Sequence, residues 1–431
     1  MRYVSVGLTL SLGSVLLLAG VDPRQHPELA VTGLIVGALG AWMSANALAR
    51  RHGGGGLVLA IALCLRLLAL YMPVGFSDDL YRYIWEGWVG LHGINPLRVP
   101  PASPMLDPFE LPLRALVNHP EIPSVYPPLA QLGFQTLAWL DPSVRCFRAG
   151  ALLIELTLLA CLWLTVTREK LPREGLYLYA LHPLPVIELI GSAHVDGAAL
   201  MLTVAALSLG HSTRARARGC GLLLLAGGAV KVLPWVLLPA LLVKNLRAHG
   251  RQFALTELGL WVGVMSLLCL PFVAPPAELL RGLSTYAAHW EFNPSVFRLL
   301  RWGLEPDAAR RVVQLLFVGL VLWGSRPEVP LRRLAQGAFL AFFLLSPTAH
   351  PWYLVWSLGL MPLLPSLSVK VLSVSVGASY LVFSGPNGWG EPPWLWSVVY
   401  GPALLAMLWE GWQVRRSGRT SPPEGVVDAC G

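Results

Sequence analysis

Apolar residues gather into long segments along the chain, and shorter polar stretches separate these segments. A helix that crosses a bilayer needs about 20 predominantly apolar residues, and many segments approach or reach that length. They lie near residues 3–20, 28–49, 56–74, 149–167, 175–191, 197–210, 253–272, 308–325, 334–347, 352–366, 370–384 and 395–412. The pattern predicts an all-α, polytopic integral membrane protein with about 12–14 transmembrane helices.

A further apolar segment, residues 220–243, is broken in its middle by Gly227-Gly228, Lys231 and Pro234. Basic residues flank it on both sides, with Arg214, Arg216 and Arg218 before it and Lys244, Arg247 and Arg251 after it. Because basic flanks mark the cytoplasmic side, the chain should cross an even number of times between them. We expect two short half-helices that meet near Lys231; one tilted, kinked helix is the alternative.

Lysine and arginine clusters predict which segment ends share a side of the membrane. The clusters lie at residues 50–51, 168–173, 214–218, 244–251, 326–333 and 415–419. The short loops 191–197, 346–351 and 385–393 contain neither residue type. By the positive-inside rule both termini are cytoplasmic, and the longer loops 75–148 and 275–307 lie outside. The expected location is the plasma (inner) membrane.

The outer loop 75–148 is too long for a simple turn and contains two amphipathic stretches. The helical spacing of apolar side chains in residues 77–92 predicts a helix that lies on the membrane. The apolar side chains expected on its membrane face are Ile84, Trp85, Trp88 and Leu91. Residues 126–140 open with Tyr-Pro-Pro-Leu, and proline suits the first turn of a helix. Whether this second helix dips into the membrane and returns, or crosses it, stays open.

Composition supports one membrane-embedded unit over residues 1–431, with a cytoplasmic tail at 413–431. Hydrophobic residues make up 55% of the chain and charged residues 13%, and the mean hydropathy is +0.58. So little charge cannot cover a soluble surface of this size. The net charge of +8 would suit nucleic acid, but its placement fits membrane orientation, so we expect no nucleic-acid partner. The apolar run after Arg2 could alternatively be a signal peptide.

The six cysteines are scattered, at positions 64, 146, 161, 220, 269 and 430, and none forms a CxxC pair. This spacing predicts neither a metal cluster nor a disulfide framework. We therefore expect no cofactor from the cysteines.

Two adjacent carboxylates, Asp78 and Asp79, follow directly on the apolar stretch that ends near Val74. Adjacent carboxylates repel each other, so at the mouth of a membrane helix they indicate a site. Asp78 suits a general base, with a solvated helix-capping acid as the alternative. Asp79 suits an acceptor-binding or phosphate-orienting partner. The pair could also share a proton or bind a divalent cation.

Polar and aromatic residues from distant segments are expected on the same outer side. They are Tyr81, Arg82, Glu86, Asn95, His119, Glu121, His194, Asp196, Asn293, Arg298, Arg301, His350, Trp352 and Tyr353. A carboxylate can take the proton of an acceptor hydroxyl, and cations can hold a phosphate leaving group. Phosphate leaves without a proton, so one base suffices. Interfacial aromatic rings suit a lipid chain or a sugar face. Together these features favour glycosyl transfer from a lipid-phosphate-linked sugar.

Several motifs in order resemble the C-type (GT-C) glycosyltransferases, most of all the polyprenol-phosphate-mannose-dependent mannosyltransferases. They are Ser77-Asp-Asp-Leu-Tyr-Arg-Tyr-Ile-Trp-Glu-Gly with Gly93-Ile-Asn-Pro, Tyr126-Pro-Pro-Leu, Ala193-His-Val-Asp-Gly, Lys231-Val-Leu-Pro and Ser346-Pro-Thr-Ala-His-Pro-Trp-Tyr. The resemblance runs from about residue 56 to 366. It implies a GT-C-like fold with juxtamembrane helices in the outer loop, and a catalytic acid at the first carboxylate of the acidic pair, Asp78.

The resemblance further implies the substrates: a polyprenyl-phosphate hexose, with mannose favoured, and a cell-envelope glycan or glycolipid acceptor on the extracytoplasmic face. We expect Arg82, Lys231, Arg298, Arg301 and His350 to bind the donor phosphate. The residues expected at the acceptor or sugar are Tyr81, Glu86, Asn95, His194, Asp196, Trp352 and Tyr353.

Structural roles compete with several of these assignments. Arg82 lies one turn after Asp78 and could simply pair with it. Lys231 is costly at membrane depth, by about 2.5–3.5 kcal/mol, and could bond freed helix carbonyls instead. Arg298 and Arg301 could touch lipid headgroups. His194 and Asp196 could instead belong to a hydrogen-bonded turn at a helix start. His350 could instead be a histidine of the interfacial aromatic belt.

An arginine and a glutamate, Arg66 and Glu155, fall within predicted spans and are expected to pair as a structural feature.

Two other functions compete with glycosyl transfer. The broken segment 220–243 and the intramembrane charges also suit a secondary transporter. A metal-dependent hydrolase or lipid transferase could use Asp78, Asp79, His194 and His350, although no HExxH-like spacing supports it.

Overall fold

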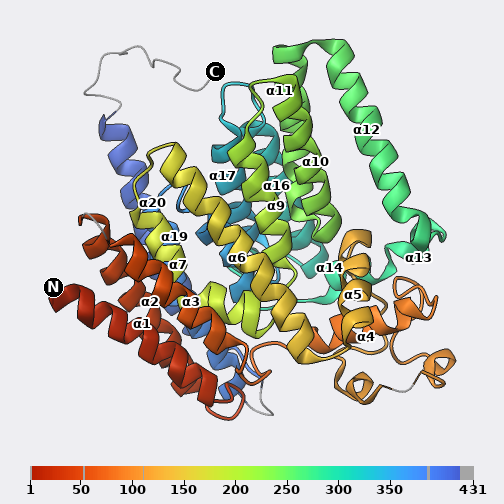
Figure 1. Cartoon of the computed structure of the whole chain (residues 1–431), viewed down its shortest axis with the longest axis horizontal. Helices are drawn as coiled ribbons and strands as arrows, with labels where there is room; N and C mark the ends of the chain where they lie inside the picture. Colours follow the sequence, from red (N-terminus) through yellow and green to blue (C-terminus); the bar gives the residue numbers. More distant parts are fainter. Residues whose placement is uncertain (1, 52–53, 110, 386–388, 418–431) are drawn as a thin grey trace.

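The computed structural model describes residues 2–51, 54–109, 111–385 and 389–417, and this part of the chain is helical without a strand (Figure 1). Residues 418–431, which include Cys430 and most of the predicted tail, lie outside the described residues. Apart from the helices, one isolated bridge joins Phe292 and Thr348. The prediction of an all-α membrane fold is confirmed.

The first half of the chain forms the N-terminal helices and the outer loop. The helices are α1 (Arg2–Gly20), α2 (Pro27–Ala49), α3 (Gly55–Ala69), α4 (Asp79–Leu91), α5 (Pro128–Leu140), α6 (Val144–Arg168), α7 (Glu174–Leu181), α8 (Pro183–Pro185), the π-helical turn η3 (Val186–Gly191) and α9 (Asp196–Leu209). Short 3₁₀ turns η1 (Pro104–Leu106) and η2 (Pro112–Leu116) lie in the outer loop. The helix boundaries follow the apolar segments closely.

The second half of the chain continues the helix bundle. Its elements are α10 (Arg214–Val230), η4 (Leu233–Leu237), α11 (Leu238–His249), α12 (Arg251–Cys269), η5 (Leu270–Phe272), α13 (Pro276–Leu279), α14 (Arg281–His289), α15 (Val296–Leu300), α16 (Pro306–Gly324), α17 (Leu331–Leu345), η6 (Pro351–Tyr353), α18 (Leu354–Leu360), α19 (Leu367–Ser375), η7 (Val376–Ser384) and α20 (Leu395–Ser417).

Four described helical segments are long and apolar enough to cross a membrane by themselves: residues 27–49, 144–168, 251–272 and 367–384. Residues 183–191 and 196–209 form a fifth candidate that bends by 118° at its break. The remaining predicted spans correspond to shorter or more polar helices, among them α3 and α7. The polytopic character is therefore confirmed, and the expected number of 12–14 crossings stays a prediction.

Small residues allow α1 and α2 to pack backbone against backbone. A Cβ atom on Gly40 would lie 2.6 Å from the Gly7 carbonyl oxygen and 2.9 Å from the Ser11 backbone nitrogen. A larger residue would therefore push the two helices apart. Close approach through glycine is the usual basis of helix pairing in lipid, where no hydrophobic force drives the helices together.

The predicted pair of Arg66 and Glu155 joins α3 to α6 in the interior. The guanidinium lies 2.7 Å from the carboxylate, and both side chains are fully buried. Arg66 also donates to the Ala180 carbonyl, and Glu155 accepts a hydrogen bond from Tyr179. The pair is confirmed as a structural contact, because the two charges neutralise each other inside the helix bundle.

The segment 220–243 forms two helices that meet at Lys231, as predicted. α10 ends at Val230 and α11 begins after the short turn η4. The Trp235 indole donates to the Leu225 carbonyl at 3.0 Å, and its ring fills the space beside Gly228 so closely that a Cβ there would clash at 1.8 Å. The two basic flanks lie together, since His249 accepts a hydrogen bond from Arg214 through its carbonyl. The kinked-helix alternative is wrong.

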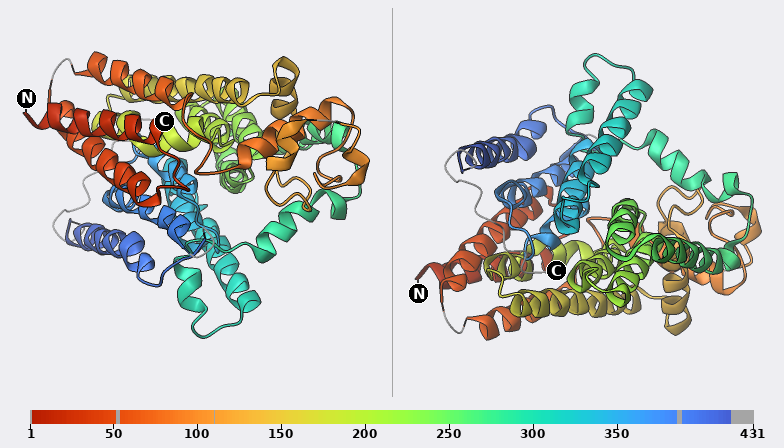
Figure 2. Two further views of the ribbon diagram at one scale, coloured as in Figure 1. Left: turned by 90° about the horizontal axis from the view of Figure 1, so that it is seen from below. Right: turned by 90° about the horizontal axis from the view of Figure 1, so that it is seen from above.

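The helix ends separate into two groups, as the charge pattern predicts. The Arg332 guanidinium bonds Glu169, and Lys244 bonds the carbonyls of Pro327 and Val329, which joins three basic loops at one end. The outer loop with α4 and α5, together with α13 and α14, lies toward the other end (Figure 1), and Figure 2 shows the outer loop on the opposite side of the molecule from α1 and α2.

The predicted juxtamembrane helices are α4 and α5, but the expected membrane face of α4 is wrong in part. Ile84 and Trp85 are buried inside the protein. Trp85 packs with Leu106 and Val117 from the same outer loop. The reason is that the loop folds back over the helix, so the apolar face meets protein instead of lipid. Leu91 is exposed, as expected.

Candidate functional site

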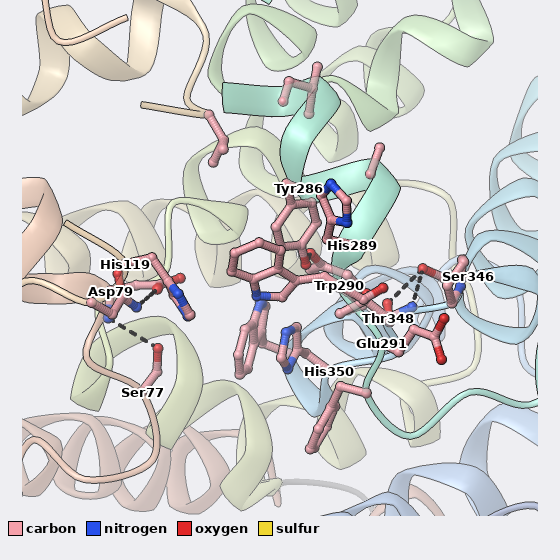
Figure 3. A pocket seen from close by; sticks show the side chains of 18 of the residues that line it. Ser77, Asp79, His119, Tyr286, His289, Trp290, Glu291, Ser346, Thr348 and His350 are labelled. Carbon is pink, nitrogen blue, oxygen red and sulfur yellow. Dashed lines mark hydrogen bonds between the residues drawn. The ribbon is translucent and has the colours of Figure 1, made fainter. Parts of the chain in front are cut away.

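A large cavity, about 1190 Å³ in volume, opens at the outer-loop end of the bundle (Figure 3). Its walls come from the loop before α4, residues 118–127, the break at Lys231, α14, α16, α17, residues 346–353 and η7. In Figure 3, Ser77, Asp79 and His119 lie on one side of the cavity, and Ser346 and Thr348 lie on the other. Segments far apart in sequence thus enclose one space, as the shared outer side predicts.

The two aspartates line this cavity but have different surroundings. Asp78 is about one-third exposed, and its carboxylate lies 3.1 Å from the Arg24 guanidinium. Asp79 accepts hydrogen bonds from Asn118 at 2.8 Å and from the Tyr126 hydroxyl at 3.1 Å. Asp79 is therefore held rigidly, whereas Asp78 keeps a freer carboxylate at the cavity surface.

The charge state of Asp79 follows from its neighbours. Burial would raise the pKa of Asp79, but the nearby His194 ring, the hydrogen bond from Asn118 and Lys231 outweigh burial and lower it. Asp79 is thus ionised at neutral pH. A carboxylate of fixed position and fixed charge suits the orientation of a substrate.

Lys231 enters the cavity at the break between α10 and η4. Its ammonium group lies 3.4 Å from the Asp196 carboxylate, and it lies over the rings of Tyr126 and Tyr353, at 5.6 and 5.4 Å from their centres. The partners of Lys231 are thus a carboxylate and two aromatic faces. They are not the carbonyls freed by the helix break, which were its alternative structural partners. A cation held in this way can meet an anionic ligand.

Aromatic rings form a stacked column on the cavity wall. His194 stacks on Trp352 at 4.1 Å, Trp352 stacks on His350 at 4.0 Å, and His350 stacks on Phe292 at 4.7 Å. Burial lowers the pKa of His350 to about 3, against the opposing effect of Asp79. His350 is therefore neutral at physiological pH and can offer a hydrogen bond but no charge to a phosphate.

Arg82 has a buried side chain that organises the loop 118–122. It donates to the carbonyls of His119 and Ile122, at 2.8 and 3.1 Å, and to the carbonyl and side chain of Asn118. Its acidic partner is Glu86 at 3.4 Å, so the alternative role for Arg82, a pairing with Asp78, is wrong. Arg82 reaches the cavity surface, but most of its donors are already engaged by this loop.

Several predicted substrate contacts lie away from the cavity. Glu86 is buried and accepts hydrogen bonds from Ser124 and Gln131, both at 2.7 Å. Burial raises the pKa of Glu86, although Arg82 opposes it. Asn95 donates to the Phe272 carbonyl, and Tyr81 packs against the cluster around Trp85. These three side chains support the outer loop instead of lining the cavity.

Arg298 and Arg301 line a second, smaller cavity of about 370 Å³, beside the first. Glu291, Trp389 and Glu391 also line it. The two arginines are therefore not brought together with Lys231 and the aspartates. Among the described residues, no group of three or more His, Cys, Asp or Glu side chains could hold a metal ion.

Sequence reasoning missed several residues of the cavity. Arg24 and Asn118 bond the aspartates, and Tyr286 bonds the Tyr353 hydroxyl at 2.9 Å. No motif indicates them, because each comes from a loop or helix whose position depends on the fold. Backbone strain is a signal that only the structure carries: His119, Ala193 and Asn293 all have positive φ, at 44°, 52° and 46°. All three lie in loops beside the cavity, where such strain is common at functional sites.

Comparison with known protein families gives one match over the first part of the chain. Residues 11–247 match the family model described as "Alpha-(1->6)-mannopyranosyltransferase, N-terminal domain". No curated protein and no solved structure gave a significant match. The matched part is more than half of the 431 residues and contains Asp78, Asp79, His194, Asp196 and Lys231. The resemblance to C-type mannosyltransferases is thereby confirmed. The chain belongs to the MptA_B family of alpha-(1->6)-mannopyranosyltransferases and is a glycosyltransferase.

Proposed function

We propose that the protein transfers a mannosyl residue from a polyprenyl-phosphate donor to a hydroxyl of a glycan or glycolipid acceptor. The observation that carries the proposal is one cavity with two carboxylates on one wall, a lysine at the helix break and an apolar wall beyond it. The family supports mannose and an α-(1→6) linkage. The positive-inside rule supports a cavity that opens on the extracytoplasmic face, with both termini in the cytoplasm.

In this proposal the carboxylates act on the acceptor hydroxyl that attacks the anomeric carbon, and the lysine acts on the phosphate that leaves it. Asp78 takes the proton of the acceptor hydroxyl as the oxygen attacks the anomeric carbon. Asp79, fixed by Asn118 and Tyr126, orients the acceptor. Lys231 stabilises the charge that grows on the departing phosphate. Neutral His350 can add a hydrogen bond to the same phosphate.

The apolar wall supports a lipid donor. Leu283 of α14, Val313 and Phe317 of α16, and Phe342 and Leu345 of α17 line the cavity on one side. Neighbouring side chains on α16, such as Leu315 and Leu322, are exposed on the outside of the helix. An isoprenoid chain would find apolar surface along this wall, while a nucleotide donor would meet few polar partners there.

The test is a donor panel with purified protein in lipid vesicles. Polyprenyl-phosphate mannose, glucose and N-acetylglucosamine are each incubated with a mannosyl acceptor, and released polyprenyl phosphate is measured. We expect release from the mannose donor, with and without a chelator of divalent cations. If the protein turns over a nucleotide sugar and none of the lipid-linked sugars, the proposal is overturned. Uptake of a labelled solute by the vesicles, without lipid phosphate release, would favour the transporter.

A further inference from the structure

A third carboxylate, Glu188, lies behind the cavity wall and has no part in the proposed chemistry. Its side chain is fully buried in the π-helical turn η3. One carboxylate oxygen accepts a hydrogen bond from the Tyr380 hydroxyl. The other oxygen lies 3.3 Å from Nε2 of His194, in an ion-pair contact that is not aligned as a hydrogen bond. A buried carboxylate is costly without a cation, so His194 is its natural partner.

The His194 ring lies between this carboxylate and the cavity. Its Nδ1 atom is 3.3 Å from the Tyr83 hydroxyl and 4.0 Å from the Asp79 carboxylate. The ring is buried and stacked on Trp352 with an angle of 19° between the planes. One edge of the imidazole therefore faces Glu188, and the other edge faces Asp79.

The local backbone brings Glu188 and His194 together. The His194 amide donates to the Glu188 carbonyl at 3.0 Å, across the end of the π-helical turn. Ala193, between the turn and His194, has a φ of 52°, which is unfavourable for an alanine. π-Helical turns and strained residues of this kind concentrate at functional sites. The contact between Glu188 and His194 is thus built into the turn.

The charges around the ring favour a doubly protonated imidazole. Asp79 and Tyr83 face it from α4, and Glu188, itself bonded by Tyr380, faces it from η3. His350 lies beyond Trp352 and is neutral, and Lys231 is paired with Asp196 at the far end of the same turn. A neutral ring would carry one N–H for two carboxylates and would give neither of them a cation in a site of low dielectric constant.

The structure assigns to Glu188 the role of a positioning residue: its carboxylate holds His194 as an imidazolium, and the imidazolium keeps Asp79 ionised and in place. This inference rests on the proposed function, because Asp79 acts on the acceptor there. Glu188 itself does not line the cavity.

The first test is the pH dependence of transfer by Glu188→Gln. Burial raises and His194 lowers the pKa of Asp79. If His194 loses its charge, Asp79 takes up a proton at higher pH, so the acid limb of the kcat profile should move to higher pH. We expect kcat at pH 7 to fall about 10–100-fold with little change in the donor KM, less than the loss of about 10²–10³-fold for removing a direct electrostatic contact, because Glu188 acts through His194. An unchanged kcat and acid limb would overturn the assignment.

A matched control separates this effect from a loss of packing. Glu155→Gln removes a buried carboxylate that is bonded in the same manner, by a cation (Arg66) and a tyrosine (Tyr179), but outside the cavity. The folded fraction of this variant should keep the wild-type acid limb. The double variant Glu188→Gln/His194→Gln should be no worse than His194→Gln alone. Losses that add would show that Glu188 acts independently of His194.

A spectroscopic readout keeps the test independent of the donor. Nitrogen NMR of histidine-labelled protein, with His194→Gln to assign the signal, should show a doubly protonated ring in wild type and a neutral ring in Glu188→Gln at pH 7. A neutral His194 in wild type would overturn the inference even if transfer is confirmed. A charged ring that becomes neutral would support the pair even if another donor is used. If Glu188→Gln does not fold, the acid limb of His194→Gln should move in the same direction, and a wild-type limb would overturn the assignment.

Discussion

The two ends of the helix bundle use charged residues in different ways. At the end with the basic loops, charged side chains join one loop to another. Arg332 bonds both oxygens of Glu169 at 2.5 Å, and Lys244 bonds two backbone carbonyls at 2.8 and 2.7 Å. At the cavity end, Asp78 and Lys231 reach the surface of an open space. Both ends contain charged side chains, and at the cavity end Asp78 and Lys231 line an enclosed space that a ligand can enter.

The comparison teaches that charge content alone does not mark a site in a membrane protein. A charged side chain can be retained because the fold satisfies it, as at Glu155 with Arg66. It marks a site when part of its hydrogen-bonding capacity is directed at a cavity, as with Asp78. The following predictions test this difference between the two ends.

The largest effect is expected at the acidic pair. Asp78→Asn removes the proposed base, so turnover should fall by about 10²–10⁴-fold. The measurement is release of polyprenyl phosphate by purified protein. Asp107→Asn is the control, because Asp107 lies in the same outer loop, exposed and paired with Arg114 at 3.0 Å, and should leave the rate unchanged. If Asp79→Asn abolishes transfer while Asp78→Asn does not, the base is Asp79.

A smaller effect is expected from two lysines, Lys231 at the break after α10 and Lys244 within α11. Lys231→Met should lower kcat/KM for the donor by about 10–100-fold, because a hydrogen bond to a charged group contributes about 1.5–3 kcal/mol. Lys244→Met should leave kcat/KM unchanged and lower the melting temperature, since Lys244 bonds backbone carbonyls of the 326–333 loop. Equal kcat/KM values for the two variants would contradict the proposed role of Lys231.

A third prediction concerns Arg148, which ties the cavity to the bundle. Its guanidinium donates to the carbonyls of Gly191 and Met72, at 2.7 and 2.6 Å, and so joins the end of η3 to the segment before Asp78. Arg148→Met should cost about 1–3 kcal/mol of unfolding free energy through unpaired carbonyls. Denaturant unfolding in detergent measures this. A variant as stable as wild type would mean that water replaces these bonds.

The smallest effect is expected at the basic end. Arg332→Ala breaks a partly exposed ion pair with Glu169, and such pairs contribute about 0–1 kcal/mol. Transfer should remain at the wild-type rate, and the melting temperature should change little. A loss of transfer comparable to that of Lys231→Met would show that the two ends are coupled.

Residue patterns predicted much of the fold because lipid imposes simple rules. The length of the apolar segments predicted the helices. The basic flanks of 220–243 predicted the break at Lys231, and α10 ends there in the structure. The face of α4 was the failure: Trp85 has the spacing of a membrane-facing residue, yet it packs on Leu106 and Val117. Spacing identifies an apolar face but not the partner that covers it.

The sequence by itself determined that the protein is helical, membrane-embedded and equipped with an acidic pair at the mouth of a helix, because these depend on local composition and periodicity. Only the tertiary structure decided which polar residues share a space. It placed Arg298 and Arg301 in a second cavity, engaged Arg82 with the 118–122 loop, and brought Glu188 to His194. Such contacts join residues that are far apart in the chain or depend on a strained turn, and no local pattern specifies them.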